Sequence, residues 1–303
     1  MRYGMLKNFD QLLSQVKDQS PRMIAVAQAE DADVLKALDK ARALGITQAI
    51  LTGHPDKISK LFRDLKINPG PYQVVAASQE NEAVQKAIEL VQSNQAQVLM
   101  KGLCSTSSFL KGILDKSTGL RSGKVISHLA VFESPAYHKL LMMSDAAMNI
   151  APDLATKVAI TENAITAAQK LGYKEPKVAI ISAVEKVNAE GIPSSADAAI
   201  IAKMGDRGQI MGAIIDGPLA VDNALSQESC TVKGLRSPVG GDADICIVPN
   251  IETGNVFYKL LTVLGKCRVA GVIVGARTPV ILTSRSDSED SKFMSIVTAL
   301  KIS

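Results

Sequence analysis

The stretch MIAVAQAEDADVLKALDKARALGITQAILTG, residues 23–53, decides the fold class. Its first six residues are mostly apolar, which predicts a buried strand over 23–28. Residues 31–45 follow with helical periodicity, acids in the first turn and Gly45 in the position that closes a helix. Residues 48–53 predict a second strand. Strand, helix and strand in this order indicate a right-handed crossover between two parallel strands.

The same alternation continues to the end of the chain. Apolar runs such as QVLMKG (97–102), KVAIIS (177–182) and VAGVIVG (269–275) predict further strands, and amphipathic patterns lie between them. Around a dozen strands are too many for one ordinary sheet, and 303 residues favour two domains. Apolar residues make up 47% of the chain, but only 4% are aromatic and Trp is absent. The sequence therefore predicts two α/β domains with mostly parallel sheets and aliphatic cores.

Charge and cysteine usage restrict the partners and the compartment. The net charge of +4 is small and no basic run occurs, so we expect no nucleic-acid partner. The chain has no stretch of about 18 apolar residues and its first residues do not form a signal peptide, so we expect no membrane partner. The four cysteines form no Cys-x-x-Cys pair, which favours free thiols in the cytoplasm; they are Cys104, Cys230, Cys246 and Cys267.

A first candidate site follows the strand at 97–102. Small and hydroxylated residues lead into a short helical pattern, including Ser105, Thr106 and, further on, Lys111. Free N–H groups at a helix start, hydroxyls and a nearby lysine suit a phosphate. The alternative is an ordinary helix whose hydroxyls serve as N-caps.

A second candidate site lies in TPVILTSRSDSED, residues 278–290, where an apolar strand runs into polar residues. Ser284 and Arg285 stand just past the strand end, and a guanidinium suits a phosphate or a developing oxyanion. Asp290 is the candidate acid or base. In the alternative interpretation Ser288 is an N-cap, Asp290 is a first-turn acid, and Arg285 is solvated or paired with a neighbouring carboxylate.

Other polar positions have ordinary structural explanations beside functional ones. An apolar strand is expected to reach Asp216 and to turn at Gly217 and Pro218. Asp216 and Asp222 are spaced for an acid/base pair or a metal, but aspartates at strand ends often form caps and turns. Gly254 either allows a ligand to approach or only permits a tight turn. The three histidines have no metal or triad spacing, and neither Gly-x-Gly-x-x-Gly nor Gly-x-Ser-x-Gly occurs where a dinucleotide or hydrolase site needs it.

Several blocks together resemble the phosphate acetyl/butyryltransferase family, and its butyryl-type branch above all. They occur in the family's order and include LRSGKVISHLAVFESPAYHKLLMMSDAAMNIAPDL, RGQIMGAIIDGPLAVDNALS, SPVGGDADICIVPNIETGNVFYKLL and GARTPVILTSRSDSEDSK. The resemblance implies two α/β/α domains with an interdomain cleft, a phosphotransacylase-type fold similar to that of isocitrate dehydrogenase. It also implies that the last helix packs on the first domain, so that 1–121 with 279–303 form one domain and 122–278 the other.

The resemblance also assigns roles to the candidate residues. Ser284 and Arg285 match the family's Ser-Arg pair, and Lys111 stands where the acetyl branch has an arginine. Asp290 is a candidate for the family's acid, although a gapless match places Ser291 there. On this basis Arg285, Ser284 and Asp290 are expected to be catalytic. The phosphate is expected to bind at the serine and threonine loop; its residues are Ser105, Thr106 and Lys111.

The implied activity is reversible transfer of a butyryl or other short or branched acyl group between CoA and phosphate. Acyl-CoA and inorganic phosphate are then the substrates, with no metal and no redox cofactor, and we expect a homodimer or a higher homo-oligomer. Three alternatives remain. They are a phosphate acetyltransferase, a non-catalytic module that binds acyl-CoA and regulates a partner, and a metal- and nicotinamide-dependent decarboxylating dehydrogenase that would use clustered aspartates; the aspartates available are Asp216, Asp222, Asp242 and Asp244.

Overall fold

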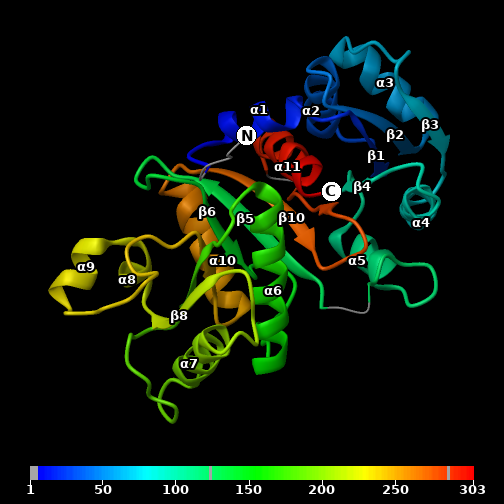
Figure 1. The fold of residues 1–303 in the computed structure, drawn as a ribbon. Coiled ribbons are helices and arrows are strands. Elements are labelled where there is room, and N and C mark those ends of the chain that lie inside the picture. The colour runs from blue at the N-terminus through cyan, green and yellow to red at the C-terminus, as the bar shows by residue number, and fades with distance from the viewer. Residues whose placement is uncertain (1–5, 123–124, 285–286) are drawn as a thin grey trace. The chain divides into compact units, whose positions relative to one another are not determined.

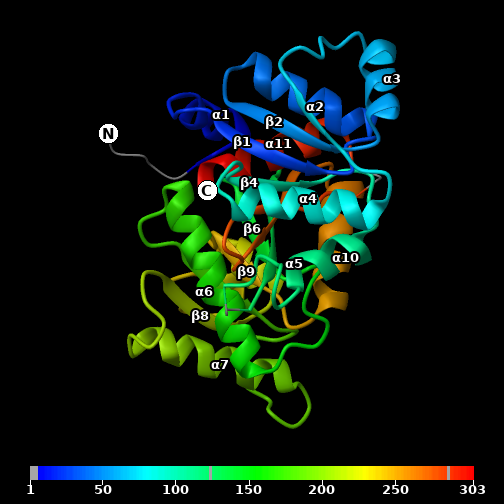
Figure 2. The same ribbon diagram turned by 90° about the vertical axis from the view of Figure 1, so that its right-hand side faces the viewer.

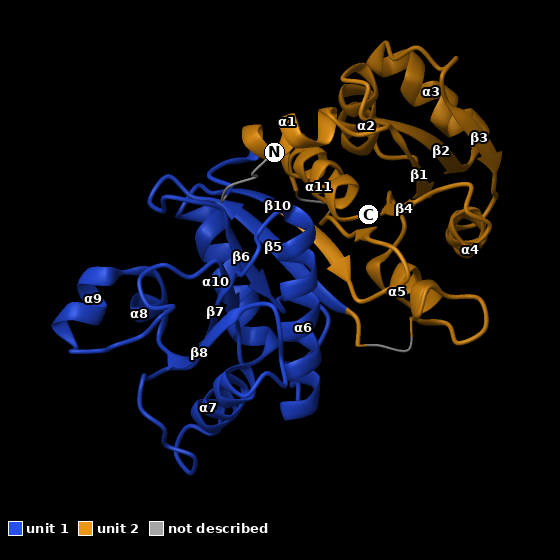
Figure 3. Cartoon of the chain, viewed as in Figure 1, with its two compact units in different colours: residues 1–9, 127–269 blue, residues 10–126, 270–303 orange. Residues whose placement is uncertain are grey.

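The chain forms two compact units, which Figure 3 distinguishes by colour. The computed structural model describes residues 6–122, 125–284 and 287–303. Unit 1 consists of Met1–Phe9 and Ser127–Val269, and unit 2 of Asp10–Ile126 and Ala270–Ser303. The chain therefore passes from one unit to the other at residues that differ from the domain boundaries predicted from the sequence. Those domain boundaries stay a prediction.

The strands of unit 2 have the order β3-β2-β1-β4-β11-β10. Figure 1 labels β1, β2, β3, β4 and β10. In unit 2, all neighbouring pairs are parallel except β10 with β11. Its elements, in chain order, are α1 (Phe9–Lys17), β1 (Arg22–Ala27), α2 (Ala32–Ala43), β2 (Thr47–Gly53), α3 (Pro55–Leu65), β3 (Gln73–Ala76), α4 (Glu80–Gln92), β4 (Val98–Lys101), α5 (Thr106–Leu114), β10 (Arg268–Val274), β11 (Val280–Ile281) and α11 (Glu289–Ile302).

The segment at 23–53 folds as its pattern predicts. Asp31 caps α2 because its side chain accepts the N–H of Val34, and Gly45 follows the helix with a positive φ of 74°. β1 pairs in parallel with β2 on one side and with β4 on the other. α11 packs against α2 on this unit, and most of its side chains are buried. The chain's last helix thus completes the unit that its first βαβ segment begins.

Unit 1 has the strand order β5-β6-β9-β7-β8, in which β5 and β6 are antiparallel and the other pairs are parallel. Its elements are β5 (Ser127–Glu133), β6 (Leu141–Ser144), α6 (Leu154–Leu171), β7 (Lys177–Ile181), α7 (Pro193–Asp206), β8 (Ile214–Leu219), α8 (Val221–Leu225), α9 (Gln227–Val232), β9 (Ile245–Ile247) and α10 (Ile251–Val263). Figure 2 shows α6 and α10 on opposite faces of these strands.

The two faces of this sheet have separate cores. Ile180 lies beside Ala198 of α7 on one face. Ile181, the next residue along β7, belongs with Phe257 of α10 to the core on the other face. Successive side chains of a strand point to opposite faces, so the continuous apolar run of β7 serves both cores. Both faces are covered, as parallel sheets require.

One predicted turn is wrong. The sequence pattern placed a turn at Gly217 and Pro218, but β8 continues through both residues to Leu219, which pairs with Ile181 after a register shift. β8 is the last strand in the order of this sheet. A proline lacks the N–H that a central strand needs, but an edge strand tolerates it where no partner lies on that side.

The predicted fold class is otherwise confirmed: two α/β units with mostly parallel strands and interleaved helices. None of the helices within the described ranges is long and apolar enough to cross a membrane.

Candidate active site

The two loops singled out in the sequence start at one edge of the unit 2 sheet. β4 and β11 are parallel neighbours, with Leu99 opposite Val280 and Met100 opposite Ile281. The carboxyl ends of parallel neighbours lie at the same edge, which is where ligands bind in open α/β sheets. The loop after β4 and the loop after β11 therefore start side by side, although they are far apart in the sequence.

The loop after β4 is held against the end of β1. Gly102 donates its N–H to the carbonyl of Ala27, and Leu103 donates to the carbonyl of Gln28. A Cβ on Gly102 would lie 2.2 Å from the Gln28 carbonyl oxygen, so only glycine fits this close approach. Further along, Gly112 allows α5 to pack closely on Val84 and Ile88 of α4. These contacts fix the direction in which α5 starts.

Ser105 is the N-cap of α5, as the structural interpretation of this loop predicted. Its hydroxyl accepts the N–H of Ser108 and donates to Glu80 Oε1 at 2.7 Å. A donor that is engaged by a carboxylate is a poor ligand for a phosphate. In this conformation Ser105 therefore sets the helix start, and a role as a direct phosphate ligand stays a prediction.

Thr106 and Ser107 form the exposed start of α5. The first N–H groups of a helix have no partner inside the helix, and the positive end of the helix dipole lies there. Lys111 is also exposed and stands four residues after Ser107, so both lie on one face of the helix. The arrangement supplies N–H donors, hydroxyls and a cation toward solvent, which suits an anion.

After β11, two hydrogen bonds join Ser284 and Asp287. Ser284 donates its N–H to Asp287 Oδ2 at 2.6 Å, and Asp287 donates its own N–H to the Ser284 carbonyl. Ser288 is the N-cap of α11, accepting the N–H of Ser291, as predicted. Asp290 lies half-buried in the first turn of α11. Arg285 lies outside the described residues, so its predicted role stays a prediction.

Two buried lysines at this edge were missed by the sequence reasoning. Lys101 ends β4 with 3% of its surface exposed, and its ammonium donates to the carbonyl of Gly102. Lys292 in α11 is 1% exposed and donates to the Asp287 carbonyl at 2.7 Å. A buried ammonium is costly unless it is paired, so lysines seldom occupy such places without a reason. The only signal of a buried lysine in the sequence is at Lys101, which directly ends an apolar strand.

Cys104 lies in the same loop but is not a nucleophile. Burial raises the pKa of its thiol to about 11, and the positive charge of Lys101 offsets only part of this effect. The thiol points into the protein, where it lies 3.6 Å from the Ala27 carbonyl oxygen. At neutral pH it stays protonated and unreactive.

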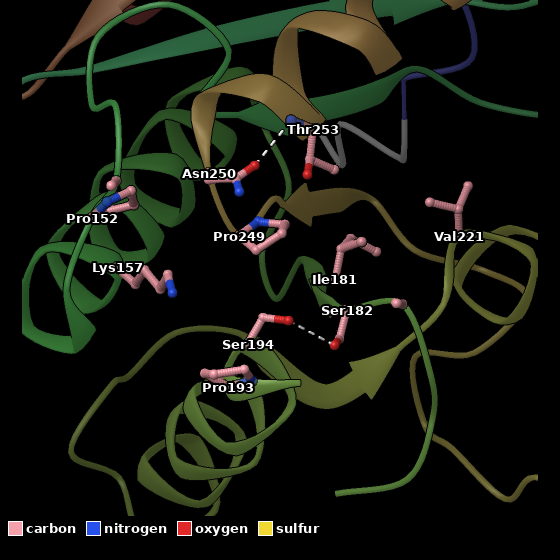
Figure 4. Close-up of a pocket in the computed structure, with 12 residues that line it drawn as sticks. Pro152, Lys157, Ile181, Ser182, Pro193, Ser194, Val221, Pro249, Asn250 and Thr253 are labelled. Atoms are coloured by element: carbon pink, nitrogen blue, oxygen red, sulfur yellow. Dashed lines mark hydrogen bonds between the residues drawn. The ribbon is translucent and has the colours of Figure 1, made fainter. Parts of the chain in front are cut away.

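Unit 1 has a pocket of about 540 Å³ at the carboxyl ends of its own strands (Figure 4). Its walls come from the loops that follow β6, β7, β8 and β9 and from the helices that these loops open. The lining residues are Ala151, Pro152, Lys157, Ile181, Ser182, Ala183, Pro193, Ser194, Val221, Pro249, Asn250 and Thr253. This pocket was not predicted, because its residues are spread over about a hundred positions, Ala151 to Thr253, of mostly ordinary apolar sequence.

The other candidate residues have structural roles. Asp222 accepts hydrogen bonds from Ser229 and Lys233, which lower the pKa of its carboxyl group. Asp216 accepts the N–H of Gly217, the next residue. Gly254 lies inside α10, where a Cβ would meet the Asp145 carbonyl oxygen at 2.6 Å. Close packing, and not the approach of a ligand, therefore explains the glycine at this position. Among the described residues no cluster of three or more His, Cys, Asp or Glu could hold a metal ion.

Asp242 and Asp244 are part of an ionic cluster at the other end of the unit 1 strands. Lys139, only 1% exposed, lies 2.8 Å from Asp242 and 2.6 Å from Asp244, and Lys177 also contacts Asp242. Burial acts to raise the pKa of Asp242, but hydrogen bonds from Lys139 and Lys177 outweigh it and hold that pKa well below its usual range. His138 contacts Asp242 at 2.9 Å. These aspartates are neutralised by lysines and form no dehydrogenase-type metal site.

Comparisons with known proteins agree with the sequence resemblance. The family model described as "Phosphate acetyl/butaryl transferase" matches residues 73–300. A phosphate butyryltransferase of Clostridium acetobutylicum is 43% identical over 97% of this chain and 98% of its own length. A phosphate acetyltransferase of Thermotoga maritima is 40% identical over 91% of this chain and 93% of its own.

Among solved structures, a branched-chain phosphotransacylase from Enterococcus faecalis superposes with a TM-score of 0.83 and 37% identity, covering 93% of this chain and 98% of that one. The fold and these similarities define an α/β transferase. The chain belongs to the phosphate acetyl/butyryltransferase family. The sequence resemblance to this family is therefore confirmed, and the dehydrogenase alternative is set aside.

Proposed function

We propose that this protein is a phosphate butyryltransferase, which transfers a butyryl or similar short acyl group reversibly between CoA and phosphate. The observation that carries this proposal is the similarity over nearly the whole chain to a relative that bears this name. An oxygen of phosphate attacks the thioester carbonyl carbon and forms a C–O bond. The C–S bond then breaks, its electron pair leaves with sulfur, and CoA departs as a thiol after taking up a proton.

In this proposal the edge of the unit 2 sheet carries the chemistry. Phosphate binds at the start of α5, with Thr106 and Lys111 as ligands and Ser105 holding the helix start. Ser284 and Arg285 stabilise the oxyanion of the tetrahedral intermediate, a role in which one donor is typically worth about 100- to 1,000-fold in rate. Asp290 accepts the thiol proton in the reverse direction. The exposed, positively polarised start of α5 and its position beside the β11 loop support this assignment.

A thiol-release assay with butyryl-CoA and phosphate tests the activity. We expect CoA release that depends on phosphate and yields one butyryl phosphate per thiol. Acetyl-CoA and isobutyryl-CoA, assayed in parallel, separate the butyryl enzyme from the phosphate acetyltransferase that the Thermotoga relative makes the second candidate. Unchanged rates in EDTA would agree with a reaction that balances without metal or redox cofactor, since CoA is a substrate. No phosphate-dependent release from any of these thioesters would contradict the proposal and favour a binding module.

A second copy of the chain is the proposed partner, and we place the enzyme in the cytoplasm, which suits its four free, buried cysteines. α10 supports the dimer because it presents four exposed apolar residues at helical spacing: Val256, Leu260, Val263 and Leu264, 51–74% exposed. Exposed Glu252 near its start and Lys266 just past its end make this face self-complementary in an antiparallel two-fold pair.

The dimer is tested by a charge in the middle of this face. Leu260→Glu should shift the protein to monomers in analytical ultracentrifugation, because the two-fold pairing would bury two like charges. Val232→Glu, at an 80% exposed position of α9 away from this face, is the matched control and should leave the assembly unchanged. A wild-type monomer, or a dimer that survives Leu260→Glu, would contradict this interface.

A further inference from the structure

We propose that the unit 1 pocket binds the acyl-pantetheine end of acyl-CoA and that Val221 limits the length of the acyl chain. The proposal rests on the proposed acyl transfer and adds a binding site and a specificity residue that the sequence did not indicate.

The pocket lies at the point of the sheet where binding sites are expected. β7 and β9 are parallel neighbours, and their exits supply Ile181, Ser182, Pro249 and Asn250 to the pocket. β7 leads into α7 on one face of the sheet, whereas β9 leads into α10 on the other. Loops that leave adjacent strands toward opposite faces open a crevice between them, and ligands of α/β sheets bind in such crevices.

The lining of the pocket suits an uncharged chain. Most of its walls are aliphatic or proline side chains, and a volume of about 540 Å³ falls within the range of small-molecule sites. In Figure 4, Val221 of α8 lies at one side, Lys157 at the other, and Ile181 near the centre. An acyl chain gains stability by burying its methylenes against such walls.

The charge of the pocket distinguishes between the two ends of acyl-CoA. Lys157 is the single ionisable side chain among the described residues that line it, and it is 8% exposed. Its ammonium lies 2.6 Å from Asp197 Oδ2, so the pair is close to neutral. The nucleotide end of CoA carries several phosphate charges and needs unpaired cations. The acyl-pantetheine end carries none, and it therefore fits this pocket better.

Polar groups in the lining match the amides of pantetheine. The Ser182 and Ser194 hydroxyls bond to each other at 2.9 Å, and Asn250 Oδ1 accepts the N–H of Thr253 as the N-cap of α10. Within the described part of the chain, the amide nitrogen of Asn250 and the hydroxyl of Thr253 have no other recorded hydrogen bond and can bind a ligand (Figure 4). A few placed polar groups in an otherwise apolar pocket orient a ligand that has both kinds of surface.

The binding test uses the two halves of the substrate. Val221→Phe places a ring at the pocket wall, at a position 36% exposed that should tolerate it. We expect calorimetry to show about tenfold weaker binding of S-butyryl-pantetheine. This is the lower end of the loss of affinity that one poorly fitting group causes in an apolar pocket. Binding of adenosine 3′,5′-bisphosphate should be unchanged. Val232→Phe, the same substitution at an 80% exposed position of α9, is the control and should alter neither affinity.

The specificity test uses acyl chains of different length. Val221→Phe should lower kcat/KM for butyryl-CoA at least about tenfold more than for acetyl-CoA, and Val221→Ala should raise the ratio of hexanoyl- to butyryl-CoA. If the Val221 variants are active and the ratios of kcat/KM between acyl-CoAs are unchanged, the inference about the pocket is wrong. It is also wrong if Val221→Phe abolishes bisphosphate binding and leaves butyryl-pantetheine binding intact. Neither result would contradict the proposed activity. A wild-type protein that binds butyryl-pantetheine in this pocket but releases no CoA would contradict only the proposed activity.

Discussion

The α5 edge of unit 2 and the pocket of unit 1 occupy the same place in their sheets but differ in chemistry. Both lie where parallel strands end and helices begin. The α5 edge offers an exposed lysine and polar loops, whereas the pocket is lined mostly by apolar side chains and its lysine is paired with Asp197. In the proposals above, the α5 edge binds the phosphate that every reaction shares, and the pocket binds the acyl group that varies.

The largest effect is expected at Arg285. Arg285→Ala should lower kcat in both directions by at least about tenfold, and by about 100- to 1,000-fold if the guanidinium binds the oxyanion. Because the oxyanion is common to all thioesters, acetyl-CoA and butyryl-CoA should lose rate equally. Arg236→Ala, at an exposed arginine of unit 1, is the control. An unchanged rate would remove Arg285 from the mechanism.

Asp290→Asn should lower kcat by about a hundredfold if this carboxylate takes the thiol proton, which is the lower end of the range for general bases. The loss should be seen with CoA and butyryl phosphate as substrates, and it should shrink as pH rises and more CoA is already a thiolate. Rate measurements over a pH series check this. A kcat that is intact at every pH means that Asp290 is only a first-turn acid of α11.

Lys111→Ala should raise the KM for phosphate about tenfold while the KM for butyryl-CoA stays the same, because one exposed charge–phosphate contact is lost. Lys111→Arg should restore most of the affinity. Lys116→Ala, an exposed lysine just beyond α5, serves as the control. If the KM for butyryl-CoA rises instead, the two regions do not divide the substrates as proposed.

The smallest effect is expected at Cys104. With its pKa raised to about 11, only about one thiol in a thousand is ionised at pH 8, against about a quarter for a thiol of ordinary pKa. The folded enzyme should therefore keep its activity in iodoacetamide at pH 8 and lose this protection as pH rises toward 11. Mass spectrometry of the labelled peptide measures this directly. Fast labelling of the folded protein at pH 8 would show that the loop is more open than described.

Part of the site was readable from the sequence for a local reason. The caps at Ser105 and Ser288 act within three residues, so the same spacing that predicts them also forms them. The strand through Gly217 and Pro218 was misread because an edge position, which the local pattern does not show, makes the proline acceptable. The engagement of Ser105 by Glu80 could not be predicted either, since it joins two helices.

By itself the sequence determined the element types, the two α/β units and the family, because periodicity, caps and collinear blocks are properties of the chain alone. Only the tertiary structure decided which strand ends meet, that Lys101 and Lys292 are buried, and that twelve scattered residues enclose a pocket in unit 1. Burial and neighbourhood depend on the strand order, which arises from long-range pairing that no local stretch encodes.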